Sequence, residues 1–346
     1  MNRVKGLVKK PPFWGFVAIL LLLAINLAKD PRYLAITVSP VTGNLVGNVI
    51  DILRVVAPIL LIAFGMCLVI ATGGIDLSVG SVMAVSGAVA MQYLHDHGAP
   101  DSVGDALAAI GLALGVALLV GLVNAVLVAV VGLQPFITTL VMMLAGRGLA
   151  KVVTQGQNTN AVNDPMRWIA NGYVLGIPVV FLLALVLIVV VAVLIRRSAL
   201  GLLIESLGVD PKAARLAGVD RRALLFSAYL LSALLAGIAG LFATGSVMTV
   251  DVSQTGYQAE LDAILAVVVG GTSLAGGRFS LGGAVVGAFL IATLDKTIVF
   301  LGVPASATPA FKAVVIVVLC LLQSQRVRGW IGQAGARMRA ARKAVA

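Results

Sequence analysis

Apolar residues are grouped along this 346-residue chain in runs of about 20, with short polar segments between them. A helix needs about 20 residues to cross a hydrocarbon core about 30 Å thick. The runs lack the alternation of apolar and polar residues, in segments of about ten, that is typical of outer-membrane β-barrels. The pattern therefore predicts an all-α, polytopic membrane protein. We expect ten transmembrane helices, some of them interrupted, at residues 12–28, 51–71, 77–94, 105–131, 136–153, 177–195, 223–244, 260–273, 281–301 and 309–324.

The composition supports a membrane protein. Of all residues, 60% are hydrophobic and only 11% are charged, whereas soluble domains carry about a quarter charged residues. The expected loops are all shorter than about 50 residues, the lower limit for a folded domain. We therefore expect one transmembrane domain over residues 1–346 and no soluble catalytic domain.

The net charge of +11 follows the expected topology. Lys and Arg near the ends of spans are retained on the cytoplasmic side of a membrane. If the N-terminus is cytoplasmic, most of the 25 basic residues fall on that side, in the segment 1–11, the loop 196–222 and the tail 325–346. We therefore expect both termini in the cytoplasm and lipid around the spans. No nucleic-acid partner is expected, because the basic residues do not cluster on an exposed domain.

The polar stretch GGIDLSVGS, residues 73–81, stands between two apolar runs. Gly73 and Gly74 free the backbone, and the side chains of Asp76 and Ser78 can satisfy amide groups that a broken helix leaves unpaired. Irregular backbone at membrane depth persists only where protein or a water-filled cavity covers it. Asp76 either caps the next helix or belongs to a functional break, and the two are compatible. The topology puts the stretch toward the cytoplasmic ends of its spans, which favours a hinge over direct capture of a ligand from outside.

The loop 196–222 contains the sequence DPKAARLAG, which predicts a very short helix. Asp210 is its N-cap, Pro211 its first helical residue, and Gly218 follows its end. Such a helix is not stable alone, so it either packs against its own spans or is presented to a partner protein. Ala213 and Ala214 would allow close approach, and Arg215 could pair with a carboxylate of that partner.

Other polar residues lie within or beside the spans, where charges are costly and usually face a bundle interior, a cavity or the interface. We expect Arg147, Lys151, Glu260 and Asp262 at the membrane interface, and Asp295 to pair with Lys296 or with a more distant base. The candidate residues of a translocation path or hinge are Gly73, Gly74, Asp76, Ser78, Asn124, Gln134, Phe136 and Asp295.

Several chemistries are not expected. The chain has no GxxxxGK[ST] phosphate loop, so it should not hydrolyse nucleotides itself. His95 and His97 lack further ligands nearby in the sequence, so we expect no metal site. No convergent acid, base or nucleophile is evident, and we expect neither an enzyme nor a cofactor.

Four segments then resemble a known family. They are GGIDLSVGSVMA, QPFITTLVMMLAGRGLA, ALGLLIESLGVDPKAARLAGV and ELDAILAVVVGGTSLAGGRFSLGGAVVGA. In this order, over about residues 50–325, they are similar to the permease subunits of bacterial ABC sugar importers of the ribose, xylose and arabinose group. Within this group, three stretches look most like the galactofuranose importer permeases. They are NVIDILRVVAPILLIAFGMCLVIATGGIDLSVGS, IESLG and FKAVVIVVLCLLQSQR. A related alternative is the permease of branched-chain amino-acid importers, although the few charges in the deep spans favour a sugar.

The resemblance implies a multi-pass inner-membrane subunit that imports galactofuranose or a related furanose or pentose. Its partners would be a cytoplasmic ABC ATPase, a periplasmic sugar-binding protein received by the external loops, and a second permease, either a related chain or a second copy. The pathway would lie between the two permeases. The short loop helix would be the coupling helix that docks on the ATPase. The residues implied in that contact are Glu205, Asp210, Pro211, Ala213, Ala214, Arg215 and Gly218.

Overall fold

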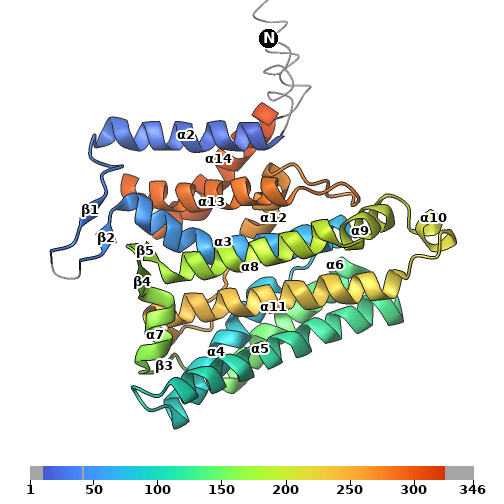
Figure 1. The fold of residues 1–346 in the computed structure, drawn as a ribbon, viewed down its shortest axis with the longest axis horizontal. Helices are drawn as coiled ribbons and strands as arrows, with labels where there is room; N and C mark the ends of the chain where they lie inside the picture. Colours follow the sequence, from blue (N-terminus) through green and yellow to red (C-terminus); the bar gives the residue numbers. More distant parts are fainter. Residues whose placement is uncertain (1–10, 41–42, 324–346) are drawn as a thin grey trace, which may run out of the picture.

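The computed structural model describes residues 11–40 and 43–323 (Figure 1). Each of the ten expected spans coincides with a helix there. The helices are α2 Pro11–Lys29, α3 Asn48–Ala71, α4 Val79–His97, α5 Val103–Val126 with a π-helical extension Leu127–Val131, α6 Pro135–Val153, α8 Val179–Arg197, α11 Arg221–Val247, α12 Ala259–Val269, α13 Leu281–Leu301 and α14 Thr308–Gln323. The segment 1–11, except for its last residue, and the tail 325–346 lie outside the described residues.

The all-α, polytopic class is confirmed. In the described part of the chain, α2, α3, α5, α6, α8, α11 and α13 are long and apolar enough to cross a membrane. The other three differ: α12 has 11 residues and α14 has 16, and the 19-residue α4 is less apolar. The number of ten spans therefore stays a prediction.

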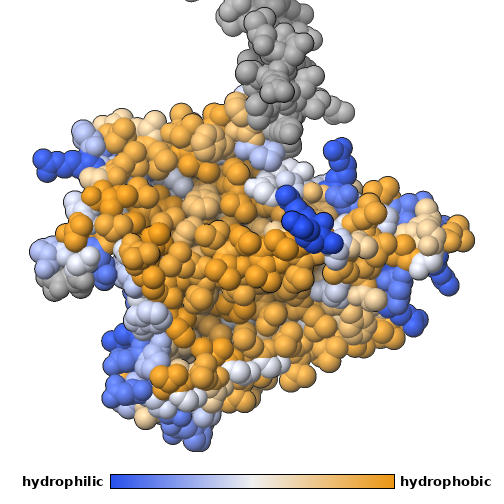
Figure 2. Space-filling view, in the orientation of Figure 1, coloured by the Kyte–Doolittle hydropathy of each residue, from blue (hydrophilic) through white to orange (hydrophobic). Residues whose placement is uncertain are grey.

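The bundle is built around α3 and α11, which pack against each other and against several further helices. Of the most apolar stretch of each helix, 78% is buried in α3 and 67% in α11, compared with 22% in α2 and in α6. The outer helices instead expose large apolar side chains, such as Leu119 of α5 and Val186 of α8. Figure 2 shows the result on one face, a broad hydrophobic surface with hydrophilic residues gathered at its two ends. This distribution suits a bundle surrounded by lipid.

The two ends of the bundle differ in structure (Figure 1). One end, here called the loop end, carries α9 Leu200–Val209 and α10 Pro211–Leu216. The other end, here called the strand end, carries α7 Asp164–Asn171 and three antiparallel pairs of two-residue strands. The pairs are β1 Thr37–Val38 with β2 Leu45–Val46, β3 Thr159–Asn160 with β6 Thr249–Val250, and β4 Tyr173–Val174 with β5 Ile177–Pro178. In the second pair Thr159 lies opposite Val250, which joins two loops that are distant in sequence.

Candidate functional site

The stretch between α3 and α4 folds back into the bundle. Asp76 is 1% exposed, and its Oδ1 accepts hydrogen bonds from the amide of Ser78 at 3.0 Å and from the Ser78 hydroxyl at 2.6 Å. Its Oδ2 accepts a third bond, of 2.9 Å, from the hydroxyl of Ser232 in α11. Asn124 of α5 donates to the Ser78 hydroxyl at 2.8 Å. The carboxylate therefore satisfies an amide at the start of α4 and binds α11, and the Ser78 hydroxyl extends this network to α5.

A second break stands opposite, in the loop 251–258 that leads into α12. Gly80 lies so close to Gly256 and to the Glu260 carboxylate that a β-carbon at Gly80 would clash with both. Arg147 of α6 holds the loop from the side, donating to the carbonyls of Thr255 and Gly256 at 2.7 Å each and to that of Val252 at 3.2 Å. The two breaks thus meet within the bundle, where protein covers their irregular backbone.

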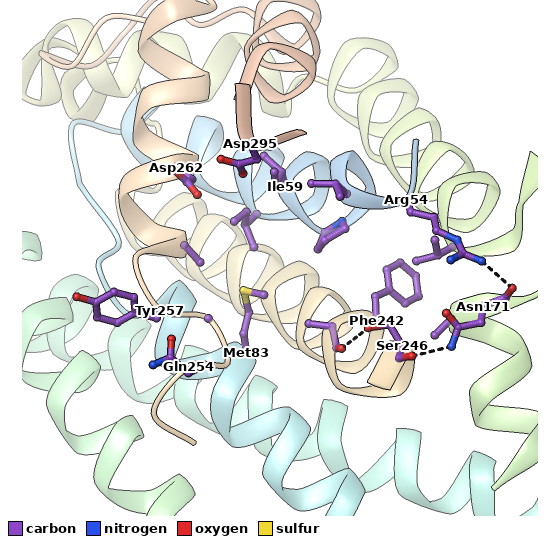
Figure 3. Close-up of a pocket in the computed structure, with 18 residues that line it drawn as sticks. Arg54, Ile59, Met83, Asn171, Phe242, Ser246, Gln254, Tyr257, Asp262 and Asp295 are labelled. Carbon is purple, nitrogen blue, oxygen red and sulfur yellow. Dashed lines mark hydrogen bonds between the residues drawn. The ribbon is translucent and has the colours of Figure 1, made fainter. Parts of the chain in front are cut away.

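A cavity of about 530 Å³ lies in the half of the bundle nearest the strand end. It is bounded by α3, α4, α7, α8, α11, the loop 251–258, α12 and α13 (Figure 3). Most of its wall is apolar, including Ile59, Met83 and Phe242. The polar side chains that line it are Arg54, Asn171, Ser246, Gln254, Tyr257, Asp262 and Asp295.

The charged residues beside this cavity are paired across helices. Lys312 of α14 lies 3.0 Å from Asp262 and 2.7 Å from Asp295. Of the two predicted partners for Asp295, the structure selects the more distant base, because consecutive helical residues point in different directions. The adjacent Lys296 instead binds Asp51 of α3 at 2.8 Å.

Arg54 lies at another wall of the cavity. It donates to the carbonyl of Asn171 at 3.2 Å and to the hydroxyl of Tyr173 at 3.0 Å. Its guanidinium also lies over the Tyr173 ring, 5.0 Å from the ring centre. The cavity therefore combines carboxylate acceptors, a guanidinium donor and aromatic surface.

The short helix predicted in the loop 196–222 is present as α10. Oδ1 of Asp210 accepts from the amides of Lys212 at 2.8 Å and Ala213 at 3.1 Å, and Pro211 is the first residue of the helix. Gly218 follows with a φ of +83°, a conformation that favours glycine. Sequence reasoning missed the preceding helix α9, because it assigned residues 200–209 to the loop 196–222.

One side of α10 packs on the protein and the other is exposed. Ala214 is buried, whereas Ala213 and Arg215 are exposed and Leu216 is 91% exposed. The alternative that the helix packs against its own protein therefore holds for the face with Ala214, and presentation of the exposed face to a partner stays a prediction. Glu205 lies on α9, beside a hollow at the loop end that Arg196 and Ser280 also line.

The loop end connects to the first break through glycines. Gly208 of α9 packs against the carbonyl of Ala71, the last residue of α3, and against Gly277. The amide of Gly277 donates to the same Ala71 carbonyl at 2.9 Å. α9 is therefore in direct contact with the end of α3, next to the break that holds Asp76.

Residues 48–322 match the family model described as the branched-chain amino acid transport system permease component. The chain belongs to this permease family. The match extends over nine of the ten helices that coincide with expected spans, from α3 to most of α14, and over both breaks. It confirms a multi-pass permease component of a transporter, as the sequence predicts, and not an enzyme.

Three relatives align with this permease over most of both chains. The fructose import permease protein FruF of Bifidobacterium longum is 50% identical over 330 residues, which cover 94% of this chain and 91% of the relative. The galactofuranose transporter permease protein YtfT of Escherichia coli is 41% identical, with coverage of 90% and 89%. The ribose import permease protein RbsC of Escherichia coli is 35% identical, with coverage of 90% and 93%. No solved structure matches the chain.

The permease residues predicted to form one path or hinge occupy three places. Asp76, Ser78 and Asn124 are hydrogen-bonded together, with Gly73 and Gly74 in the same break. The first-turn region of α6 exposes Gln134 and Phe136, and Asp295 lines the cavity. The part that these residues play in transport stays a prediction.

Several residues of the cavity were not recognised from the sequence. The expectation of an interfacial Asp262 did not anticipate its ion pair with Lys312 or its place in the cavity wall. Lys312 is a single charge within an apolar run, which is the signal that could have revealed it. Arg54, a charge inside the expected span 51–71, carries the same signal. Gln254 and Tyr257 carry none, because they lie in a loop where polar residues are ordinary.

Proposed function

We propose that this chain is the membrane permease of an ATP-driven importer that moves a monosaccharide across the bacterial inner membrane. One observation carries the proposal: relatives named for fructose, galactofuranose and ribose each align over about nine-tenths of the chain. All three sugars can adopt five-membered rings. The substrate class is therefore a furanose-forming hexose or a pentose, with galactofuranose and fructose as the first candidates.

The partners follow from this function. A cytoplasmic ABC ATPase would supply the energy, because the chain carries no phosphate loop of its own. Its docking site is the exposed face of α10, with Arg215 and Leu216, while α9 contributes Glu205. The close contact of Gly208 with the Ala71 carbonyl supports the transmission of a movement of α9 and α10 into the bundle.

The remaining partners meet other surfaces. A substrate-binding protein would deliver the sugar at the strand end, where α7 and the strand pairs form an ordered surface. A second permease, identical or related, would complete the membrane assembly. This arrangement places the loop end and both termini in the cytoplasm, in agreement with the basic residues Arg196, Arg197, Arg221 and Arg222 at the loop end.

Import of a branched-chain amino acid is the alternative, because the matching family model carries that description. The relatives named above disfavour it. The charges beside the cavity also disfavour it: Lys312 is already paired with two carboxylates, and Arg54 is hydrogen-bonded within the protein. A zwitterion would have to replace these contacts.

Uptake into proteoliposomes tests the proposal. The chain is reconstituted with its partner permease, and labelled fructose, galactofuranose, ribose and leucine are supplied with and without the ATPase and the binding protein. We expect uptake of one monosaccharide that requires both other components and ATP. Uptake by the permease alone, or of leucine in place of every sugar, would contradict the proposal.

A further inference from the structure

We propose that the cavity at the strand end binds one monosaccharide within a single permease chain, with Asp262, Asp295 and Arg54 as its polar contacts. This inference rests on the proposed sugar-import function and adds the place and the chemistry of recognition. It also differs from a pathway that lies only between two permeases, because the lining comes from α3, α4, α11, α12 and α13 of one chain.

The size and position of the cavity fit such a ligand. Its volume of about 530 Å³ lies within the range of about 300–1,000 Å³ that is typical of small-molecule sites. Gly256 lines the cavity and contacts Gly80, so the meeting point of the two breaks closes the cavity on that side. A sugar that enters from the strand end would stop before it reaches the Asp76 network.

Asp262 and Asp295 supply acceptors for sugar hydroxyl groups. Their side chains are 18% and 27% exposed, and both line the cavity. Lys312 forms ion pairs with both carboxylates but does not itself line the cavity, so it does not occupy the space available to a ligand. An ionised carboxylate has about four lone-pair sites, which leaves acceptor capacity on each residue after the lysine is bound.

Arg54 supplies donors for sugar oxygens. Figure 3 shows it on the opposite side of the cavity from the two carboxylates. Its Nη2 is committed to Asn171 and Tyr173, but its buried Nε has no hydrogen-bond partner among the described residues. A buried donor without a partner is costly, and a ligand oxygen would remove this cost.

The balance of charge indicates a neutral ligand. Two carboxylates face one ammonium and one guanidinium, so the group needs no charge from outside. Phe242 and Tyr257 also line the cavity, and aromatic rings can contact the apolar C–H faces of a sugar. An amino acid, with two separate charges, would meet no unpaired countercharge here.

Cysteine protection tests this site in the complete reconstituted assembly. Ser246, which lines the cavity, and Ser253, which is exposed in the loop 251–258 but does not line it, are each changed to cysteine in a chain without its native cysteines. The rate of modification by a water-soluble maleimide is measured with the sugar that the assembly transports. A sugar at about ten times its Kd should slow the modification of Ser246→Cys about tenfold. Ser253→Cys and added leucine serve as matched controls that should show no protection.

A second pair of variants tests the recognition chemistry. In the Ser246→Cys chain, Asp295→Asn should raise the sugar concentration for half-protection at least about fivefold, because the amide accepts fewer hydrogen bonds. Asp51→Asn is the control, since it also breaks a lysine pair but lies outside the cavity wall. An equal shift for both variants would overturn the assigned contact.

The outcomes separate this inference from the proposed function. If a sugar is transported but Ser246→Cys reacts at the same rate with and without it, the cavity is not the binding site, and the import function stands. Equal protection of Ser253→Cys would likewise overturn the site. If no monosaccharide is transported, the proposed function fails and this inference fails with it.

Discussion

The Ser232 hydroxyl donates a hydrogen bond of 2.9 Å to Oδ2 of Asp76, and this bond fastens the break after α3 to the middle of α11. Because α11 is one of the two central helices, the break is held by the core of the protein. The same carboxylate orders the start of α4 through Ser78. The stability of the protein and the geometry of the break therefore both depend on the Asp76 side chain.

Asp76→Ala should destabilise the permease before it alters substrate choice. The change leaves the hydroxyls of Ser78 and Ser232 without their acceptor, and buried unpaired polar groups of this kind should lower the free energy of unfolding by about 2–4 kcal/mol. Thermal unfolding in detergent measures the effect. Asp101→Ala, at an exposed loop position, is the control and should change little. A fully stable Asp76→Ala protein that transports a different sugar would contradict this prediction.

Gly208→Ala should disturb the contact between the loop end and α3. A β-carbon there would clash with the Ala71 carbonyl and with Gly277, at a cost of about 1–3 kcal/mol. We expect a lower melting temperature and less sugar moved per ATP hydrolysed. Gly111→Ala provides the matched comparison, because nothing lies within 4 Å of its added carbon. Equal behaviour of the two variants would show that α9 does not need this close approach.

Arg147→Lys should loosen the loop 251–258. Lysine cannot reproduce the three hydrogen bonds from one guanidinium to the carbonyls of Val252, Thr255 and Gly256. Amide hydrogen exchange in this loop should become about tenfold faster or more. The control is Lys151→Arg, one turn further along α6 and exposed. Unchanged exchange in Arg147→Lys would mean that other contacts hold the loop.

Lys312→Gln should be more destabilising than Lys296→Gln. Lys312 forms ion pairs with two carboxylates and its side chain is 17% exposed, whereas Lys296 pairs with an Asp51 side chain that is 45% exposed. We expect losses of about 1–3 kcal/mol and below about 1 kcal/mol, respectively. Denaturation in mild detergent compares the unfolding free energies of the two variants. Adding Asp295→Asn to Lys312→Gln should restore part of the loss, and the absence of any rescue would argue against the ion pair.

Arg215→Glu and Gly218→Pro should uncouple ATP hydrolysis from uptake. Arg215 is on the exposed side of α10, and its reversal would repel a carboxylate on the ATPase. Gly218 has a φ of +83°, which proline cannot adopt because its ring holds φ near about −65°. Sugar uptake per ATP should fall about tenfold or more, by analogy with the loss of a charged interface contact. Arg222→Glu, exposed in the first turn of α11 and outside α10, should retain coupling.

The membrane helices could be predicted from the sequence because their causes are local. A run of about 20 apolar residues must form its own backbone hydrogen bonds in lipid, so Asn48–Ala71 and Leu281–Leu301 fall within a few residues of the expected spans. The caps of α10 are equally local, since Asp210 bonds amides two and three residues away. The family resemblance also followed from contiguous motifs.

The site required contacts between residues distant in the chain. Asp295 meets Lys312 and Asp262 rather than its neighbour Lys296, and Asp76 meets Ser232, 156 positions later. No periodic pattern encodes such pairs, because they depend on how whole helices pack and rotate against one another. The cavity beside Arg54 and the close approach of Gly80 to Gly256 likewise exist only once that packing is complete. Local hydrogen bonding and hydropathy thus predict the helices, whereas long-range packing creates the cavity and the contact between the two breaks.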